Sequence, residues 1–215
     1  MPYIYAISDI HGELEIFKET LALVDLNDRE NKLVLLGDYI GREEGTHQWE
    51  ALSFIKDLQE KNKSQVIVLM GNHELMFLED TENESSSIVK WLRTLPYIYE
   101  TDTQIFVHAG IDEEAGEWWK YTSEDYYFCS KYPPRKGPFY KDIIAGHVAV
   151  SQIANDREYN RVYWDARNHF YIDGDVEITK NLLVLKYNVD TGRYSSFEKT
   201  AQCDGDFIWI EYVIK

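Results

Sequence analysis

Five short apolar runs, each followed at once by polar residues, constrain the fold of this 215-residue chain more than any other feature. Each run is too short for a helix and too continuous for a half-exposed strand, so each is predicted to be a buried strand. Helical periodicity separates the first three runs, which predicts crossover connections and a largely parallel sheet. The runs lie at residues 3–7, 33–36, 66–70, 105–107 and 142–145.

The last third of the chain has a different pattern. Four consecutive segments between residues 161 and 214 are rich in β-branched and aromatic residues, and Asp190, Thr191 and Gly192 form a turn signal inside one of them. We expect these segments to pair in a mainly antiparallel way. Because no linker or low-complexity tract separates the two parts, we predict one α/β domain over residues 1–215, with two sheets that share one core.

An acidic composition limits the partners of the chain. The 38 acidic and 22 basic residues give a formal net charge of −16, which repels phosphate backbones and anionic lipids. We therefore expect no binding to nucleic acid or to membranes. The start of the sequence lacks a signal-peptide pattern, and no apolar run approaches the roughly 20 residues that span a bilayer. A cytoplasmic protein is expected, with a monomer as the starting assumption.

The two cysteines, Cys129 and Cys203, show no metal-ligand spacing. Free cysteine is among the most often buried residue types, so packing is the expected role of both. This usage is typical of a reducing compartment.

Polar motifs follow every predicted strand: SDIHG, GDYIGR, GNHE, HAG and GHV, in chain order. The carboxyl ends of the strands in an open α/β sheet meet at one crevice, so we expect these motifs to converge. They contain four of the six histidines together with aspartates, but no cysteine. Oxygen and imidazole ligands without thiolates suit manganese, iron or zinc, and a carboxylate such as Asp38 can bridge two ions about 3.5–4 Å apart.

In this order, DxHG, GDxxxR, GNHE, HAG and GH resemble the motifs of the calcineurin-like metallophosphoesterases, especially the bacterial PPP-type serine/threonine phosphatases. The motifs extend from Asp9 to His147, and YIDGD at residues 171–175 faintly resembles a strand that this family places later. The resemblance implies a four-layer α/β/β/α sandwich with two mixed β-sheets.

The resemblance also implies a pair of divalent metal ions. Manganese is expected, with iron or zinc as alternatives. The side chains that correspond to the family's ligands are Asp9 and His11 on the first ion, Asp38 on both ions, and Asn72, His108 and His147 on the second.

Two further residues of the motifs are expected to act on the substrate. Arg42 corresponds to the family's phosphate-binding arginine, and its planar fork can hold two phosphate oxygens. His73 corresponds to the general acid, which as an imidazolium would protonate the leaving alkoxide. The metal pair would lower the pKa of a bridging water, so that hydroxide attacks phosphorus near neutral pH. A plainer reading makes Arg42 and His73 surface partners of Glu43 or Glu74.

Gly41 is a departure from the family pattern, which usually reads GDxxDR with an aspartate directly before the arginine. That aspartate supports the catalytic histidine, so without it the protonated form of His73 should be less favoured. Glu43 and Glu44, in the adjoining loop, are the candidate substitutes.

The segment upstream of the last motif is a second departure, because it contains no match to the family's second phosphate-binding arginine. Lys131, Arg135 and Lys136 are the candidates in its place. The same region is rich in aromatic residues from Trp118 to Tyr140. These rings either pack over the core or form a wall beside the metals that selects the leaving group, for instance by stacking an adenine or binding a phosphotyrosine ring.

The leading functional hypothesis is a metal-dependent phosphomonoesterase that acts on phosphoprotein, as a serine/threonine or tyrosine phosphatase. The first alternative is a dinucleotide polyphosphate hydrolase of the diadenosine tetraphosphatase type, which resembles these phosphatases in every metal motif. The second alternative is a degenerate, non-catalytic module that binds metal and a phosphorylated partner. Gly41 and the missing second arginine motivate this last reading.

Overall fold

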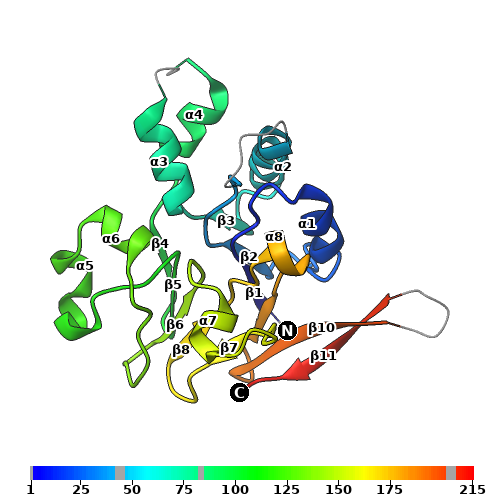
Figure 1. Ribbon diagram of the computed structural model, residues 1–215, viewed down its shortest axis with the longest axis vertical. Helices are drawn as coiled ribbons and strands as arrows, with labels where there is room; N and C mark the ends of the chain where they lie inside the picture. Colours follow the sequence, from blue (N-terminus) through cyan, green and yellow to red (C-terminus); the bar gives the residue numbers. More distant parts are fainter. Residues whose placement is uncertain (1, 42–46, 82–84, 202–206) are drawn as a thin grey trace.

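The computed structural model describes residues 2–41, 47–81, 85–201 and 207–215, and its strands form two sheets (Figure 1). The first sheet has the strand order β11-β10-β9-β1-β2-β3, and the second has the order β4-β5-β6-β8-β7. The strands of the first sheet are β1 (Tyr3–Ile7), β2 (Lys32–Leu35), β3 (Val66–Val68), β9 (Leu185–Asn188), β10 (Arg193–Ala201) and β11 (Phe207–Val213). Those of the second are β4 (Ile98–Glu100), β5 (Gln104–Val107), β6 (Asp142–Ala145), β7 (Tyr163–Trp164) and β8 (His169–Tyr171).

The predicted parallel strands are found in both sheets. β1, β2 and β3 are parallel neighbours in the first sheet, and β5, β6 and β8 are parallel neighbours in the second. The late strands do not form an antiparallel sheet of their own. Instead, their expected antiparallel pairing occurs in both sheets: β9 pairs with β1, β10 with β9 and β11 with β10 in the first sheet, and β7 borders the second beside β8. The predicted turn at residues 190–192 joins β9 to β10.

Helices cover the outer faces of the sheets. Side chains alternate along β1, so Ile4 and Ala6 point into the core between the sheets while Tyr5 and Ile7 pack under α1 and α2. These helices are α1 (Leu14–Leu21) and α2 (His47–Lys61). On the second sheet, residues of α5, α6 and α7 enter the apolar core. The predicted four-layer arrangement with two mixed sheets is confirmed.

The remaining helices are short and lie beside the ends of the strands. They are α3 (Asn72–Asp80), α4 (Ser87–Leu92), η1 (Glu113–Trp118), α5 (Trp119–Thr122), α6 (Asp125–Ser130), α7 (Val150–Ala154) and α8 (Val176–Thr179). Among the helices of the described residues, none has both the length and the apolar character to cross a bilayer. Cys129 is buried in α6, where its thiol donates to the carbonyl of Met70 at 3.3 Å, whereas Cys203 lies outside the described residues.

A buried tyrosine joins the two sheets. Tyr194 on β10 is 1% exposed, and its hydroxyl accepts from the Gln104 side chain of β5 at 3.1 Å. The same hydroxyl donates to the carboxylate of Asp142, at the start of β6, at 2.9 Å. One residue of the first sheet therefore forms hydrogen bonds with two polar side chains of the second.

Removing this hydroxyl should destabilise the fold. We expect Tyr194→Phe to lower the free energy of unfolding by about 1–3 kcal/mol, because Gln104 and Asp142 lose a buried partner. Urea denaturation measures the change. Tyr187→Phe, on a half-buried ring of the neighbouring strand, is the matched control. Equal effects of the two variants would contradict a specific role for the Tyr194 hydroxyl.

Candidate metal centre

Sharp backbone turns follow the strands that carry the polar motifs. Asp9, His11, Asp38 and His147 have φ angles of 55°, 45°, 56° and 66°, which lie in the left-handed region. This conformation is uncommon for residues with a side chain, although Asp, Asn and His adopt it more readily than most. Four of the six predicted ligands thus hold a strained backbone, a feature that clusters at functional sites.

Glycines make room for these turns. A Cβ added at Gly71 would lie 2.3 Å from both the backbone nitrogen and Oδ1 of Asp38. One added at Gly146 would lie 2.1 Å from Oδ2 of Asp9. The glycine that begins each of these two motifs, GNHE and GHV, is therefore required for the loops to come close enough for their side chains to converge.

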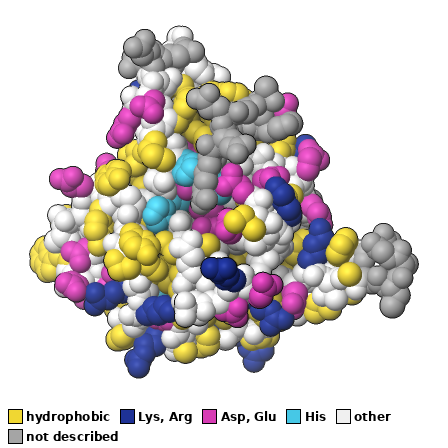
Figure 2. All heavy atoms as spheres, viewed as in Figure 1, with side chains coloured by type: hydrophobic (Ala, Val, Ile, Leu, Met, Phe, Trp, Pro, Cys, Tyr) yellow, Lys and Arg dark blue, Asp and Glu magenta, His cyan; other side chains and the backbone are white. Residues whose placement is uncertain are grey.

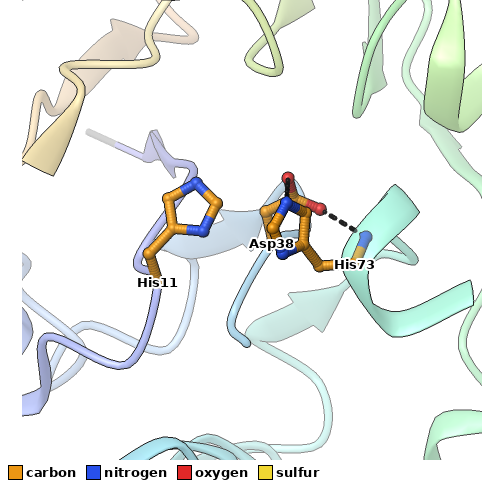
Figure 3. A group of neighbouring side chains, drawn as sticks. All are labelled: His11, Asp38 and His73. Carbon is orange, nitrogen blue, oxygen red and sulfur yellow. Dashed lines mark hydrogen bonds and ion pairs between the residues drawn. The ribbon is translucent and has the colours of Figure 1, made fainter. Parts of the chain in front are cut away.

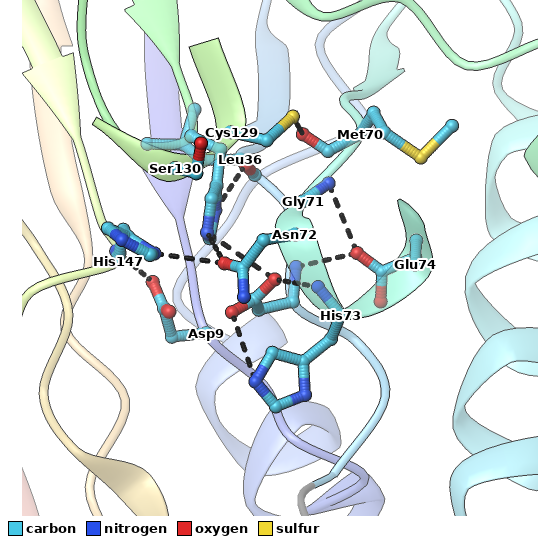
Figure 4. A network of polar contacts seen from close by, with 12 residues as sticks. Asp9, Leu36, Met70, Gly71, Asn72, His73, Glu74, Cys129, Ser130 and His147 are labelled. Carbon is cyan, nitrogen blue, oxygen red and sulfur yellow. Dashed lines mark hydrogen bonds and ion pairs between the residues drawn. The ribbon is translucent and has the colours of Figure 1, made fainter. Parts of the chain in front are cut away.

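The predicted ligands of the second metal meet at one amide oxygen. Oδ1 of Asn72 lies 2.9 Å from Nε2 of His108 and 2.9 Å from Nδ1 of His147 (Figure 4). Oδ1 of Asp38 lies 3.4 Å from the same His108 nitrogen. Asp38, His108 and His147 offer donor atoms that all lie within 4.8 Å of one another, which is close enough for one ion.

A second group of donors shares Asp38 with the first. His11, Asp38 and His73 also offer atoms that lie within 4.8 Å of one another (Figure 3). Asp9 lies beside this group, with Oδ1 at 3.7 Å from Nε2 of His11 and Oδ2 accepting the backbone N–H of His147 at 3.1 Å. The shared carboxylate is the one expected to bridge two ions.

Backbone carbonyls fix the histidine rings. Nδ1 of His11 lies 3.1 Å from the carbonyl of Ile40, and Nδ1 of His108 lies 3.1 Å from the carbonyl of Leu36. A carbonyl only accepts, so Nδ1 carries a proton in both rings and Nε2 remains to bind a cation. Metal-binding histidines are commonly oriented in this way.

The electrostatics of the centre favour positive charge. Burial lowers the pKa of His108, but the carboxylates of Asp38, Asp9 and Glu74 together outweigh this effect and raise that pKa to about 9. Burial raises the pKa of Asp9, and the charge of Asp38 adds to the effect although His108 opposes it. Burial and the nearby His108 lower the pKa of His147 to about 4. The site without metal therefore combines buried carboxylates with a neutral His147 and a protonated His108, and once His108 loses its proton this donor set fits divalent first-row ions.

Sequence reasoning missed the role of Glu74. It is buried, with 0% exposure, rather than a surface partner of His73. Its Oε2 accepts the N–H groups of Asp38 (2.8 Å) and Gly71 (3.1 Å), and its Oε1 accepts those of Tyr39 (2.8 Å) and Ile40 (3.0 Å). In return, Oδ1 of Asp38 accepts the N–H of His73 at 3.1 Å. An acid at the third helical position is a capping signal that the motif GNHE contains.

Asp173 is another buried acid beside the centre. It is 4% exposed, and burial together with the charge of Asp9 raises its pKa. The faint match of YIDGD was its only signal in the sequence. One oxygen of its carboxylate accepts the N–H of Asp175 at 2.8 Å, which orders the turn into α8.

Position 41 offers little room for the family's aspartate. A Cβ at Gly41 would lie 2.9 Å from the carbonyl oxygen of His11, so a side chain there would displace a predicted ligand. Oε1 of Glu177, on α8, lies 3.9 Å from the same point. Arg42, Glu43 and Glu44 lie outside the described residues, so their predicted roles stay predictions.

The three basic candidates for a second phosphate contact already have protein partners. Lys131 is buried and donates to the carbonyl of Ile111 at 2.6 Å and to the carboxylate of Glu113. Arg135 pairs with the exposed Glu114 at 2.9 Å. Lys136 donates to the carbonyl of Ile153 at 2.9 Å.

The aromatic segment is divided between the core and the surface, and its expected role as a wall beside the metals stays a prediction. Trp119 and Phe128 are buried in the core, whereas Trp118, Tyr121 and Tyr132 are exposed by 69%, 80% and 72%. Figure 2 shows histidine side chains at the molecular surface with acidic and hydrophobic side chains around them. The side chain of His73 is 16% exposed, so a ligand can reach it from solvent.

Metal binding should release protons and therefore strengthen as pH rises. Below about pH 9 the site without metal holds a proton on His108, and the raised pKa of Asp9 keeps a further proton there at lower pH. We expect the Kd for Mn²⁺ to fall about tenfold per pH unit for each proton released between about pH 6 and pH 8. Calorimetry in buffers of different ionisation enthalpy counts these protons. A Kd for Mn²⁺ that does not change with pH would contradict metal binding at His108 and Asp9. Asp80→Asn, at an exposed residue of α3, is the control.

Glu74→Gln should disrupt the centre despite its equal size. Whichever way the amide points, its NH₂ group faces two backbone N–H donors, so we expect a loss of about 3 kcal/mol in the free energy of unfolding. Weaker Mn²⁺ binding should accompany it, because Asp38 and Gly71 are no longer held together. Denaturation and calorimetry measure the two effects. Glu79→Gln, exposed on the same helix, is the control. A Glu74→Gln variant with wild-type stability would refute the role of Glu74 as the acceptor of four backbone N–H groups.

Comparison with known proteins identifies the family of this chain. Residues 2–191 match the model of the calcineurin-like phosphoesterases. A symmetrical bis(5'-nucleosyl)-tetraphosphatase of Chromobacterium violaceum is 31% identical over 125 residues, which are 50% of this chain and 43% of that protein. The chain thus spans less than half the length of this curated relative.

Solved structures share the fold. The crystal structure of a putative diadenosine tetraphosphatase superposes with a TM-score of 0.64 at 14% identity, over 97% of this chain and 93% of that one. A cold-active protein tyrosine phosphatase gives a TM-score of 0.62 at 17% identity, over 99% and 80% of the two chains. The chain belongs to the calcineurin-like phosphoesterase family.

Proposed function

We propose that this chain hydrolyses dinucleotide polyphosphates in a metal-dependent reaction. The observation that carries the hydrolase assignment is the pair of donor groups that share Asp38. Curated relatives named as symmetrical tetraphosphatases support the substrate class and favour it over the phosphoprotein that led the sequence hypotheses. The metal in the cell is manganese in this proposal, with iron or zinc as alternatives.

The proposed ligand roles are those of the sequence motifs, and the short distances among these residues support them. Asp9, His11 and Asp38 would hold one ion, and Asp38 with Asn72, His108 and His147 would hold the other. When bound, such ions polarise a phosphate and make water a nucleophile near neutral pH. The protein itself supplies fixed rings and a buried, acidic surrounding, so little rearrangement is needed on binding.

In this proposal His73 gives a proton to the leaving group. Its Nε2 lies 3.8 Å from Oδ2 of Asp38, and its ring lies edge-on to His11 with centroids 4.9 Å apart. The partial exposure of its side chain leaves it accessible to a substrate. Arg42 is proposed to bind phosphate on the strength of the sequence motif.

Position 41 favours a substrate with a good leaving group. A carboxylate on that residue would back His73 and strengthen its action as an acid, but Gly41 provides none and has no room for one without displacement of His11. A nucleotide phosphate leaves from a phosphoanhydride with little protonation, whereas a serine alkoxide needs a proton. The exposed rings of Trp118 and Tyr121, 6.0 Å apart, offer flat apolar surface on which a base can stack.

A substrate panel with Mn²⁺ tests the proposal. We expect diadenosine tetraphosphate to give ADP with a kcat/KM about a hundredfold or more above that for a phosphoserine peptide, the factor that an acid catalyst commonly contributes. Asp38→Asn should abolish turnover of both substrates, and His73→Asn should cost more with the peptide than with the dinucleotide. Asp80→Asn is the matched control.

Two outcomes would overturn the proposal. A phosphopeptide that is hydrolysed faster than any dinucleotide would restore the protein phosphatase reading. Stoichiometric Mn²⁺ binding without turnover of any substrate would instead identify a binding module.

A further inference from the structure

The sheet edges of this protein differ greatly in length. Three of the four edge strands are short: β3 and β4 have three residues each, and β7 has two. Short edge strands protect proteins from unwanted pairing. The fourth edge, β11, has seven residues in unbroken register with β10, from Phe207 opposite Ala201 to Val213 opposite Ser195.

β11 also lacks the usual protective residues. It contains no lysine or proline, and its one charged residue is Glu211. The carboxylate of Glu211 accepts hydrogen bonds from Lys186 Nζ at 3.0 Å and from Ser195 Oγ at 2.6 Å. Figure 1 shows the β10–β11 hairpin extending away from the rest of the molecule. The large exposed side chains of this strand are Phe207 (58%), Ile208 (41%), Ile210 (48%) and Val213 (69%).

Three charged side chains of β10 and β11, among the described residues, form ion pairs. Glu198 pairs with Arg161 at 2.7 Å, Lys199 with Glu19 at 2.6 Å, and Glu211 with Lys186 at 3.0 Å. A strongly basic or acidic partner would gain little attraction here. In a chain of net charge −16, such a neutral, apolar edge is where two copies can approach with the least repulsion.

The sequence of β11 is compatible with pairing to itself. When two such strands lie antiparallel about a two-fold axis through Ile210, Ile210 faces its own copy. Trp209 then faces Glu211, and Ile208 faces Tyr212. No like charges stand opposite each other, and the two first sheets become one continuous sheet.

We propose that β11 is a dimerisation edge that pairs with β11 of a second copy of this chain. Pairing would satisfy the outward backbone groups of β11 and bury its exposed apolar side chains. The strand contributes a small area, so the dimer belongs to the weak class of interfaces, with a Kd on the order of 10 μM.

Sedimentation of the full chain over a concentration series around this Kd tests the proposal. We expect the wild type to change from monomer to dimer and Ile210→Lys to stay monomeric, because the lysine would face its own copy across the axis. Ile178→Lys, at a residue of α8 that is 77% exposed, should dimerise like the wild type. Circular dichroism and urea unfolding verify that each variant is folded. A wild type that stays monomeric, or an Ile210→Lys variant that still dimerises, would overturn the proposal.

A cross-link tests the register independently. In a Cys203→Ser background, Ile210→Cys should form a disulfide between copies on mild oxidation, since directly opposed residues of antiparallel strands lie about 5 Å apart. Ile178→Cys in the same background should remain uncross-linked. Equal cross-linking of the two variants would contradict pairing at Ile210.

Discussion

The buried carboxylate of Glu74 accepts four backbone N–H groups, and the geometry of the candidate metal centre depends on this interaction. Three of the donors belong to the loop after β2, and the fourth, Gly71, stands just before α3. Without the acid, these donors would be buried and unsatisfied, which costs more than most single contacts supply. The same clamp determines where α3 begins, and so where Asn72 and His73 stand relative to Asp38.

The centre also depends on how the two sheets meet. Asp9, His11 and Asp38 follow strands of the first sheet, whereas His108 and His147 follow strands of the second. The distances between these groups therefore report the packing of one sheet on the other. Polar contacts inside the core, such as that of Tyr194 with Gln104 and Asp142, help to fix this packing.

The sequence predicted the parts of the site that depend on short continuous segments of the chain. Short apolar runs, each followed by a polar motif, indicated the parallel strands, and strand-end convergence brought Asn72, His108 and His147 together as expected. The division of late strands between two sheets was not visible, because pairing partners are set by tertiary packing. Glu74 was missed because its burial depends on a loop more than 30 residues away, and the crowding at Gly41 comes from a carbonyl of another loop.

The left-handed backbone at Asp9, His11, Asp38 and His147 has a consequence for how this centre can change over time. Alanine or a β-branched residue at such a position would lose the ligand and strain the turn together, whereas asparagine would lose charge and keep the turn. Substitutions that remove a metal ligand at these positions are therefore expected to favour a few polar residues, such as asparagine. Descendants that replace these ligands should therefore retain the shape of the site.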